Sequence, residues 1–161
     1  MRVGHGFDMH PLKEGRKLVL GGVIISFPKG LDGHSDADVL IHSIIDALLG
    51  AVGEGDIGQR FGVEDPKYLG ISSLSLLREV SDLIGSNGFR IENLDATLVA
   101  QEPRLAPYLG LMEENIAKVL GVDPGRVNVK ATTAKGMGLI GAGEGIACHA
   151  IACLSSLSPL Q

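Results

Sequence analysis

The sequence ADVLIHSIIDALLGA, residues 37–51, is the clearest indication of architecture in this chain. Its apolar side chains recur every three or four residues, which is the spacing that one face of an α-helix presents. Ser35 lies just before the segment and Asp38 lies three residues after Ser35, a capping-box pattern that predicts Ser35 as the N-cap. We therefore expect a helix here whose apolar face packs on the core.

Strand and helix patterns are interleaved along the rest of the chain. Their order predicts an α/β (α+β) fold in a single domain over residues 1–161, with a mixed sheet, helices layered on it and a C-terminal tail at 155–161. The patterns predict strands at residues 1–10, 17–20, 23–27, 89–101, 126–133 and 146–154, and further helices at 72–87 and 107–120.

The last predicted strand, residues 146–154, carries apolar side chains on both of its faces. The chain has too few predicted helices to cover both faces of a sheet. We therefore expect helices on one face and the sheet of a neighbouring subunit against the other. The alternative is a monomer in which the early hairpin, residues 17–27, folds over the second face.

Composition excludes several classes of protein. The net charge is −5 and aromatic residues make up 4% of the chain, which argues against nucleic-acid binding by charge or by base stacking. No apolar run is a convincing membrane span, and the first ten residues, MRVGHGFDMH, lack the pattern of a signal or transit peptide. The two cysteines, Cys148 and Cys153, are expected to be reduced thiols in a cytoplasmic protein.

An aspartate and two histidines are candidate metal ligands. Asp8 and His10 are two apart on a predicted strand, so both side chains point to the same face. His42 lies on the predicted helix, within a stripe of polar residues at helical spacing. The four members of this stripe are Ser35, Asp38, His42 and Asp46. Three such ligands with a fourth position open are typical of catalytic zinc. The alternatives are a surface Asp–His pair near a turn and a solvated helix face.

Three loop segments have compositions suited to a phosphorylated ligand. Residues 33–36 precede the helix, where backbone N–H groups suit a phosphate and His34 could add a hydrogen bond. Residues 53–58, GEGDIG, follow the helix, and Asp56 could hydrogen-bond a ribose diol. Residues 130–136, KATTAKG, predict a second phosphate cradle. Each segment is equally compatible with an ordinary cap, turn or polar loop.

Together these segments resemble the 2-C-methyl-D-erythritol 2,4-cyclodiphosphate synthase family of the non-mevalonate isoprenoid pathway. The similarity runs collinearly from Met1 to about Leu154 and rests on several independent motifs in the same order. These are RVGHGFDMH, LGG, KGL, HSDADVLIH, DALLGA, GEGDIG, QEPR at residues 101–104, VNVKATT and GEGIA.

The resemblance implies a homotrimer with active sites between neighbouring subunits. It also implies a phosphorus–oxygen lyase that converts 4-diphosphocytidyl-2-C-methyl-D-erythritol 2-phosphate into the cyclic diphosphate plus CMP. In that reaction the 2-phosphate of the substrate attacks the β-phosphorus, so no Ser or Cys nucleophile is required, and none stands out in the sequence. We expect the protein to act by positioning the substrate and stabilising charge.

The resemblance assigns roles to individual residues. Asp8, His10 and His42 match the zinc ligands, with one Zn²⁺ in each active site. His34 and Thr133 match the positions that stabilise the transition state. Further substrate contacts are implied for Met9, Ser35, Asp46, Ile57, Phe61 and Asp65, ribose contacts for Asp56 and Gly58, and a cytidine pocket for Ala100, Arg104, Leu105, Ala106, Ala131, Thr132 and Thr133.

The chain departs from the family's pattern at several positions. Lys135 stands where the family has the glutamate that holds a second divalent ion, Mg²⁺ or Mn²⁺. A cation cannot ligate that ion, so we expect Lys135 to neutralise the diphosphate of the substrate instead. Ala142 stands where many relatives have Arg, in an axial cavity that holds isoprenoid diphosphates in some of them, so weak or absent binding of these is expected. The segment 62–65 departs as well.

Two further histidines lie outside the proposed ligand set. His5 lies on the strand face opposite Asp8 and His10, and His149 stands where relatives often have Glu. Both are expected either to face the axis of the trimer or to be packed histidines.

Two other functions fit the same candidate residues. A zinc-dependent phosphohydrolase acting on a nucleoside diphosphate would use the same ligands to activate water. A non-catalytic protein would bind isoprenoid diphosphates in the axial cavity. A structural zinc site is disfavoured because no cysteine belongs to the ligand set.

Overall fold

The computed structural model describes residues 1–62 and 65–157 of the chain. Residues 63–64, which belong to the divergent segment 62–65, and residues 158–161 of the predicted tail lie outside the described residues. The elements are β1 (Arg2–Glu14), β2 (Leu18–Leu20), β3 (Val23–Ile25), β4 (Lys29–Leu31), α1 (Val39–Val52), α2 (Ile57–Phe61), η1 (Pro66–Tyr68), α3 (Ser73–Ser86), β5 (Phe89–Val99), η2 (Ala106–Tyr108), α4 (Leu109–Leu120), η3 (Pro124–Arg126), β6 (Val127–Thr132), α5 (Gly138–Gly141) and β7 (Gly145–Ser156).

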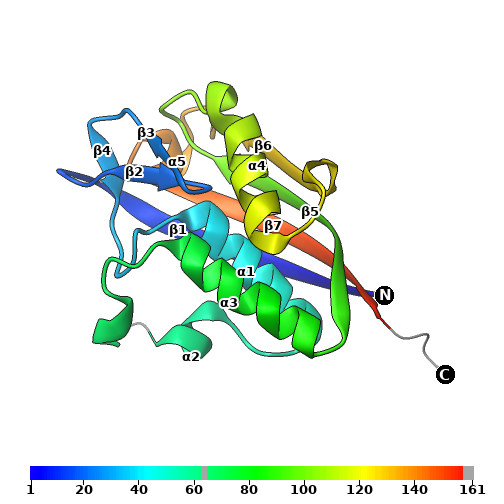
Figure 1. The fold of residues 1–161 in the computed structure, drawn as a ribbon. Helices are drawn as coiled ribbons and strands as arrows, with labels where there is room; N and C mark the ends of the chain where they lie inside the picture. The colour runs from blue at the N-terminus through cyan, green and yellow to red at the C-terminus, as the bar shows by residue number, and fades with distance from the viewer. Residues whose placement is uncertain (63–64, 158–161) are drawn as a thin grey trace.

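Five strands form one sheet in the order β4-β1-β7-β5-β6, and β2 pairs with β3 in a separate ribbon (Figure 1). The two longest strands, β1 and β7, run antiparallel from Arg2 opposite Leu154 to Pro11 opposite Gly145. The pair β5 and β6 is parallel, whereas β4–β1 and β7–β5 are antiparallel. The sheet is therefore mixed, which confirms the predicted fold class.

Helix α1 lies directly against β1 because β1 has glycines on the face that meets the helix. A Cβ atom on Gly4 would lie 1.9 Å from the backbone oxygen of Ala47, and one on Gly6 would lie 1.9 Å from that of Ser43. No side chain fits at either position without moving the helix. This close approach brings His42 of α1 within reach of the inward-facing residues near the end of β1.

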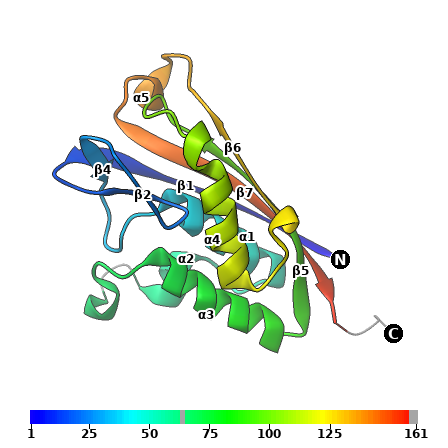
Figure 2. The same cartoon turned by 45° about the horizontal axis from the view of Figure 1, so that its top comes forward.

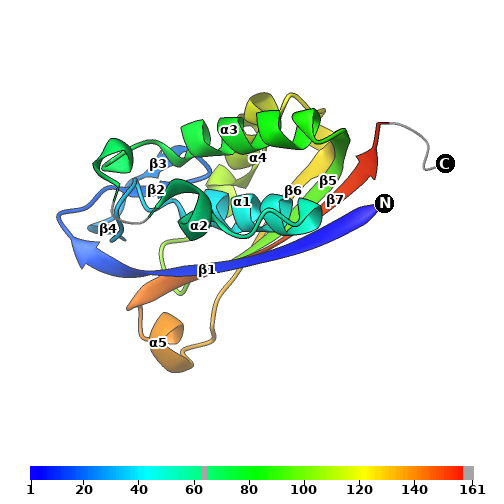
Figure 3. The same cartoon turned by 90° about the horizontal axis from the view of Figure 1, so that it is seen from below.

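The helices α1, α3 and α4 lie on one face of the five-stranded sheet, as Figures 2 and 3 show, and the short α5 lies on the other side. The buried apolar core lies between these three helices and the sheet. The outer face of β1 and β7 exposes Val3, Phe7, Met9 and Ile151, which are 46% to 66% accessible. The prediction of helices on one face is confirmed, and the outer face is uncovered in the single chain.

The predicted N-cap of the first helix is wrong. The helix begins after Asp38, because Ala37 adopts a positive φ of 56° and turns the chain there, so Ser35 lies outside the helix. Asp38 is completely buried, and its carboxylate also accepts the backbone N–H groups of Gly21 and Gly22 at 3.0 and 2.8 Å. This contact ties the β2–β3 ribbon to the helix side of the sheet, so the ribbon does not fold over the outer face.

Several short elements have no counterpart among the predicted ones. The strand β4 and the helices α2 and α5 contain three, five and four residues, which is too short for a periodic pattern. Both cysteines are free, and Cys148 is buried. No helix within the described part of the chain is long and apolar enough to cross a membrane.

Candidate active site

Asp8 and His10 of β1 meet His42 of α1 in a triangle of potential metal ligands. Asp8 Oδ2 lies 2.9 Å from His10 Nε2 and 3.1 Å from His42 Nδ1, and the two nitrogens are 3.2 Å apart. An ion with bonds of ~2.0–2.1 Å at tetrahedral angles separates its donor atoms by about 3.3 Å. The triangle therefore fits one face of a tetrahedral site and leaves the fourth position open.

The charges in this triangle suit a cation. Burial alone would raise the pKa of Asp8, but hydrogen bonds from His10 and His42 outweigh burial and lower the pKa far below its usual range. Burial alone would lower the pKa of His10, whereas its hydrogen bond to Asp8 raises the pKa above the ordinary value. The aspartate is thus an ionised carboxylate that stabilises positive charge beside it.

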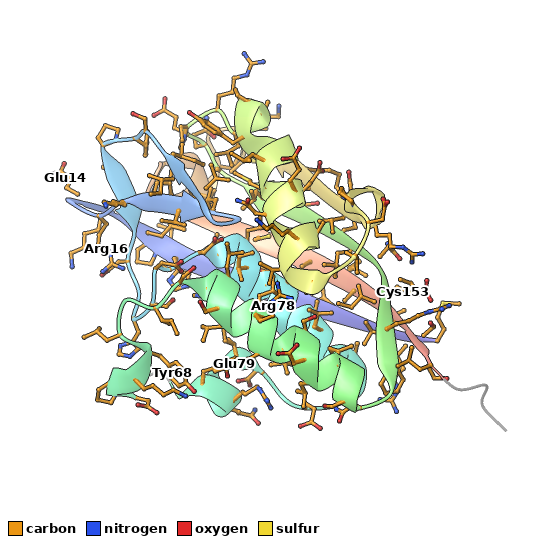
Figure 4. All side chains as sticks on the ribbon, in the orientation of Figure 1. Glu14, Arg16, Tyr68, Arg78, Glu79 and Cys153 are labelled. Atoms are coloured by element: carbon orange, nitrogen blue, oxygen red, sulfur yellow. The ribbon has the colours of Figure 1, made fainter. Side chains whose placement is uncertain are left out.

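Arg16, labelled in Figure 4, lies in the turn between β1 and β2 and holds the loop that leads into α1. Its guanidinium donates to the backbone oxygens of Leu31, Gly33 and Ser35 at 3.1, 3.1 and 3.3 Å. The same loop carries His34. Three hydrogen bonds from one rigid planar group therefore fix the backbone of the loop that carries the predicted site residues His34 and Ser35.

The ligand triangle forms part of the wall of a cavity of about 190 Å³. His34 also lines this cavity, and its Nε2 lies 2.9 Å from the backbone oxygen of Asp65. Tyr68, labelled in Figure 4, lines it as well and packs edge-on against Phe61, although an isolated aromatic residue gave no indication of a site in the sequence. The lining residues are Asp8, His10, His34, Ser35, His42, Ile57, Gly58, Phe61, Gly62, Tyr68 and Leu76.

Three predicted substrate contacts have backbone partners in the single chain. The carboxylate of Asp46 accepts the N–H of Ile57 at 2.8 Å, and burial raises the pKa of Asp46. Asp56 is the N-cap of α2 and Asp65 is the N-cap of η1. None of these three carboxylates is among the described residues that line the cavity. Each holds in place a segment that does.

A second cavity, of about 520 Å³, lies between the loop after β5 and the end of β6. Of the predicted residues near it, Ala106 does not line it and begins η2 instead. Lys130 points elsewhere and pairs with Asp95, so the second cradle does not use its charge. The lining residues are Ala100, Gln101, Glu102, Pro103, Arg104, Leu105, Ala131, Thr132, Thr133 and Lys135.

The resemblance implies that His34 and Thr133 both stabilise the transition state, but the structure does not bring them together in one chain. His34 lines the smaller cavity and Thr133 lines the larger one. Among the described residues, none lines both cavities. Met9 is also separated from Asp8 and His10, because its side chain lies on the outer face of the sheet and is 54% exposed. In one chain these predicted residues are therefore distributed over two cavities and the outer face of the sheet.

His5 and His149 meet on the outer face of the sheet. His5 Nε2 lies 3.3 Å from His149 Nδ1, and the centroids of the Phe7 and His149 rings are 4.7 Å apart. The two histidines therefore pack against each other in the single chain. Their position relative to a trimer axis stays a prediction.

Comparison with known proteins identifies relatives over nearly the whole chain. The YgbB family model matches residues 1–155. A curated 2-C-methyl-D-erythritol 2,4-cyclodiphosphate synthase of Syntrophotalea carbinolica is 57% identical over 155 residues, which are 96% of this chain and 94% of the relative.

Solved structures show the same fold. The bifunctional IspDF from Campylobacter jejuni superposes with a TM-score of 0.93 at 42% identity, over 96% of this chain but 42% of that longer one. An IspF from Plasmodium falciparum, solved as a CDP complex, superposes with a TM-score of 0.86 at 36% identity, over 98% of this chain and 97% of that one.

Proposed function

The chain belongs to the YgbB family, and on that basis we propose that it is a 2-C-methyl-D-erythritol 2,4-cyclodiphosphate synthase. Its substrate would be 4-diphosphocytidyl-2-C-methyl-D-erythritol 2-phosphate, and its products the cyclic diphosphate and CMP. The triangle of Asp8, His10 and His42 in the wall of the smaller cavity is the observation that carries this proposal. A relative of that name, more than half identical over nearly the whole chain, supports it.

The ion that we assign to the triangle is Zn²⁺. Asp8 Oδ2, His10 Nε2 and His42 Nδ1 would hold it, and a set of one carboxylate and two imidazoles without cysteine is typical of catalytic zinc. When bound, zinc supplies Lewis acidity to a diphosphate oxygen at the open position.

The reaction needs positioning more than it needs an activated nucleophile. An oxygen of the 2-phosphate forms a new bond to the β-phosphorus, while the bond from that phosphorus to the bridging oxygen of CMP breaks. The nucleophile is already an anion on the same molecule, so no side chain has to remove a proton from it. We assign to His34 and Thr133 the stabilisation of charge on the transferring phosphoryl group.

The cytidine end of the substrate would occupy the larger cavity. Its walls combine small residues such as Ala100 and Ala131 with the polar side chains of Arg104 and Thr132, which suits a flat base with polar edges. Asp56 and Gly58, at the start of α2, would contact the ribose. The Asp56 carboxylate would keep its capping role while sharing its oxygens with the ribose hydroxyls.

A homotrimer would complete the site. His34 and Thr133 line separate cavities in one chain, and packing of two copies would set the His34 cavity of one against the Thr133 cavity of the other. The uncovered outer face of β1 and β7, with Val3, Phe7 and Ile151 exposed, is the surface that we assign to subunit packing. The two free cysteines suit the cytoplasm, where we place the enzyme.

The second divalent ion is replaced, in our proposal, by Lys135. This side chain lines the larger cavity and is exposed to it, and its charge is of the sign that a diphosphate attracts. Mg²⁺ or Mn²⁺ would then be dispensable as long as zinc is present.

Phosphorus NMR of the zinc-loaded protein with the cytidyl substrate tests the function directly. The expected signals are those of the cyclic diphosphate and of CMP in equal amounts. Linear hydrolysis products would instead identify a phosphohydrolase, and no turnover would favour a non-catalytic binding protein. A spectrum recorded after incubation with zinc removed should show unconverted substrate.

A further inference from the structure

On the side that points away from the ligand triangle, His42 contacts a serine that in turn contacts an aspartate. His42 Nε2 lies 2.9 Å from Ser73 Oγ, and the Ser73 hydroxyl in turn donates to Asp36 Oδ1. Ser73 is completely buried, at the first turn of α3. A chain of hydrogen bonds therefore runs from a carboxylate, through a hydroxyl, to the ring of a metal-ligand candidate.

The direction of these bonds follows from what each group can donate. The Asp36 carboxylate only accepts, and it also receives the backbone N–H of Ser73 at 2.9 Å and that of Asp38 at 3.2 Å. The single hydroxyl proton of Ser73 is therefore committed to Asp36. Toward His42 the hydroxyl oxygen can then only accept, which requires a proton on His42 Nε2.

In the metal-free chain Nδ1 can donate to the ionised Asp8 carboxylate, and zinc would displace that proton. An imidazole that then keeps its proton on Nε2 has its lone pair on Nδ1. Nδ1 is the atom of His42 that faces Asp8 and His10 in the triangle. We propose that Asp36 and Ser73 are positioning residues that hold His42 in the Nε2-protonated form and so direct its Nδ1 lone pair at the metal. This inference rests on the zinc site of the proposed function.

His10 is held in the opposite form. Its Nδ1 lies 2.7 Å from the backbone oxygen of Asp32, which only accepts, so Nδ1 keeps its proton when zinc displaces the proton that Nε2 shares with Asp8, and the lone pair is then on Nε2. The two histidine ligands thus differ in which nitrogen carries the proton. In each histidine the position of the proton is set by a hydrogen-bond acceptor outside the triangle. Groups behind metal ligands commonly have this role.

Ser35 is a weaker candidate for the same role. Its hydroxyl lies 3.1 Å from His42 Nε2, farther than that of Ser73. It accepts the backbone N–H of Ala37, but its own proton is free to turn toward Ser73 Oγ at 3.5 Å, so its direction is not fixed. Ser35 also lines the smaller cavity, where its hydroxyl is accessible to a ligand. The buried hydroxyl of Ser73, with its proton fixed by Asp36, defines the orientation better.

Zinc affinity of the metal-free protein tests the proposal. We expect Ser73→Ala to bind Zn²⁺ about 10- to 100-fold more weakly than wild type in competition with a chromophoric chelator. Ser43→Ala is the matched control, because Ser43 is equally buried and one residue from His42, but its hydroxyl donates to the backbone oxygens of Val39 and Cys148 rather than contacting the His42 ring. Its zinc affinity should equal that of wild type.

Nitrogen-detected NMR of the zinc-loaded wild type gives a second readout that needs no variant. The expected spectrum shows the proton on Nε2 of His42 and on Nδ1 of His10. Wild-type zinc affinity in Ser73→Ala, or a protonated Nδ1 on His42, would overturn the proposal while leaving the proposed function intact. Failure of the wild type itself to bind zinc would overturn both.

Discussion

Lys135 is the residue of the proposed site that departs most clearly from the pattern of the family. It adopts a positive φ of 56°, and its backbone N–H lies 3.4 Å from Thr133 Oγ1, so a tight turn presents its side chain next to the larger cavity. A flexible cation at this place offers a diphosphate the countercharge that a divalent ion would otherwise supply.

We predict that removing Mg²⁺ while keeping Zn²⁺ costs the wild-type enzyme little activity. The variant Lys135→Glu should lose most of its activity in zinc alone and regain part of it when Mg²⁺ is added, because a carboxylate repels the diphosphate unless an ion lies between them. Initial rates of CMP release with and without Mg²⁺ measure both effects. A wild type that is inactive without Mg²⁺ would contradict the role given to Lys135.

Asp38 is a buried carboxylate with a structural role, and its ionisation links stability to pH. Burial raises the pKa of Asp38 to about 6, although the backbone N–H groups of Gly21 and Gly22 favour the charged form. The folded chain therefore keeps this proton to a higher pH than the unfolded chain does. Raising the pH from about 4 to about 6 consequently removes stability from the wild type.

The variant Asp38→Asn should lack this pH dependence. The wild type loses stability between pH 4 and pH 6 and the variant does not. The unfolding free energy of the variant minus that of the wild type is therefore expected to rise by on the order of 2 kcal/mol over this range and to stay level above it. Urea unfolding at several pH values and one protein concentration measures the difference. A difference that does not change with pH would show that Asp38 is ionised throughout.

At the scale of elements, the packing of α1 on β1 is what assembles the metal ligands. Asp8 and His10 reach the same face through the two-residue repeat of a strand, and His42 reaches them because glycines let the helix lie against the sheet. The ligands Asp8 and His42 are 34 positions apart in the sequence, so the triangle depends on the contact between α1 and β1.

We predict that Gly6→Ala destabilises the fold by about 3 kcal/mol or more and weakens zinc binding as well, because its Cβ would clash with the backbone oxygen of Ser43. Gly85→Ala, in the exposed part of α3, is the control. Its Cβ would meet no atom within 4 Å, so this variant should be more stable by roughly 0.5–1 kcal/mol. Denaturant unfolding and zinc titration of both variants would detect the contrast, and equal effects would contradict it.

At the scale of the whole molecule, the two faces of the sheet differ in what covers them. Three helices bury the inner face, whereas the outer face presents apolar side chains and the contact between His5 and His149 to solvent. A surface of this kind on a single chain is typical of subunit packing.

We predict that Ile151→Glu prevents assembly without unfolding the chain. Ile151 is 46% exposed at the centre of the outer face, so a charge there costs little in the single chain but would be buried in a trimer. Ile24→Glu, on β3 and 65% exposed away from that face, should leave the trimer intact. Sedimentation equilibrium gives the mass, and a trimeric Ile151→Glu protein would refute this assignment of the interface.

The sequence alone determined the features that belong to single elements. The period of two placed Asp8 and His10 on one face, helical spacing located α1, α3 and α4, and the apolar last strand indicated an uncovered sheet face. These inferences succeed because the repeat of a strand or helix is a local property of the backbone. The collinear motifs further indicated the family, to which the chain belongs.

How those elements meet could be seen only in the folded chain. It turned Asp38 away from the predicted polar stripe and toward the β2–β3 ribbon, and it placed Ser73 of α3 behind His42. It also put His34 and Thr133 into different cavities of one chain. Such contacts depend on the register and close packing of residues that are far apart in the sequence. A local repeat of apolar residues carries no information about them, because it describes a single strand or helix.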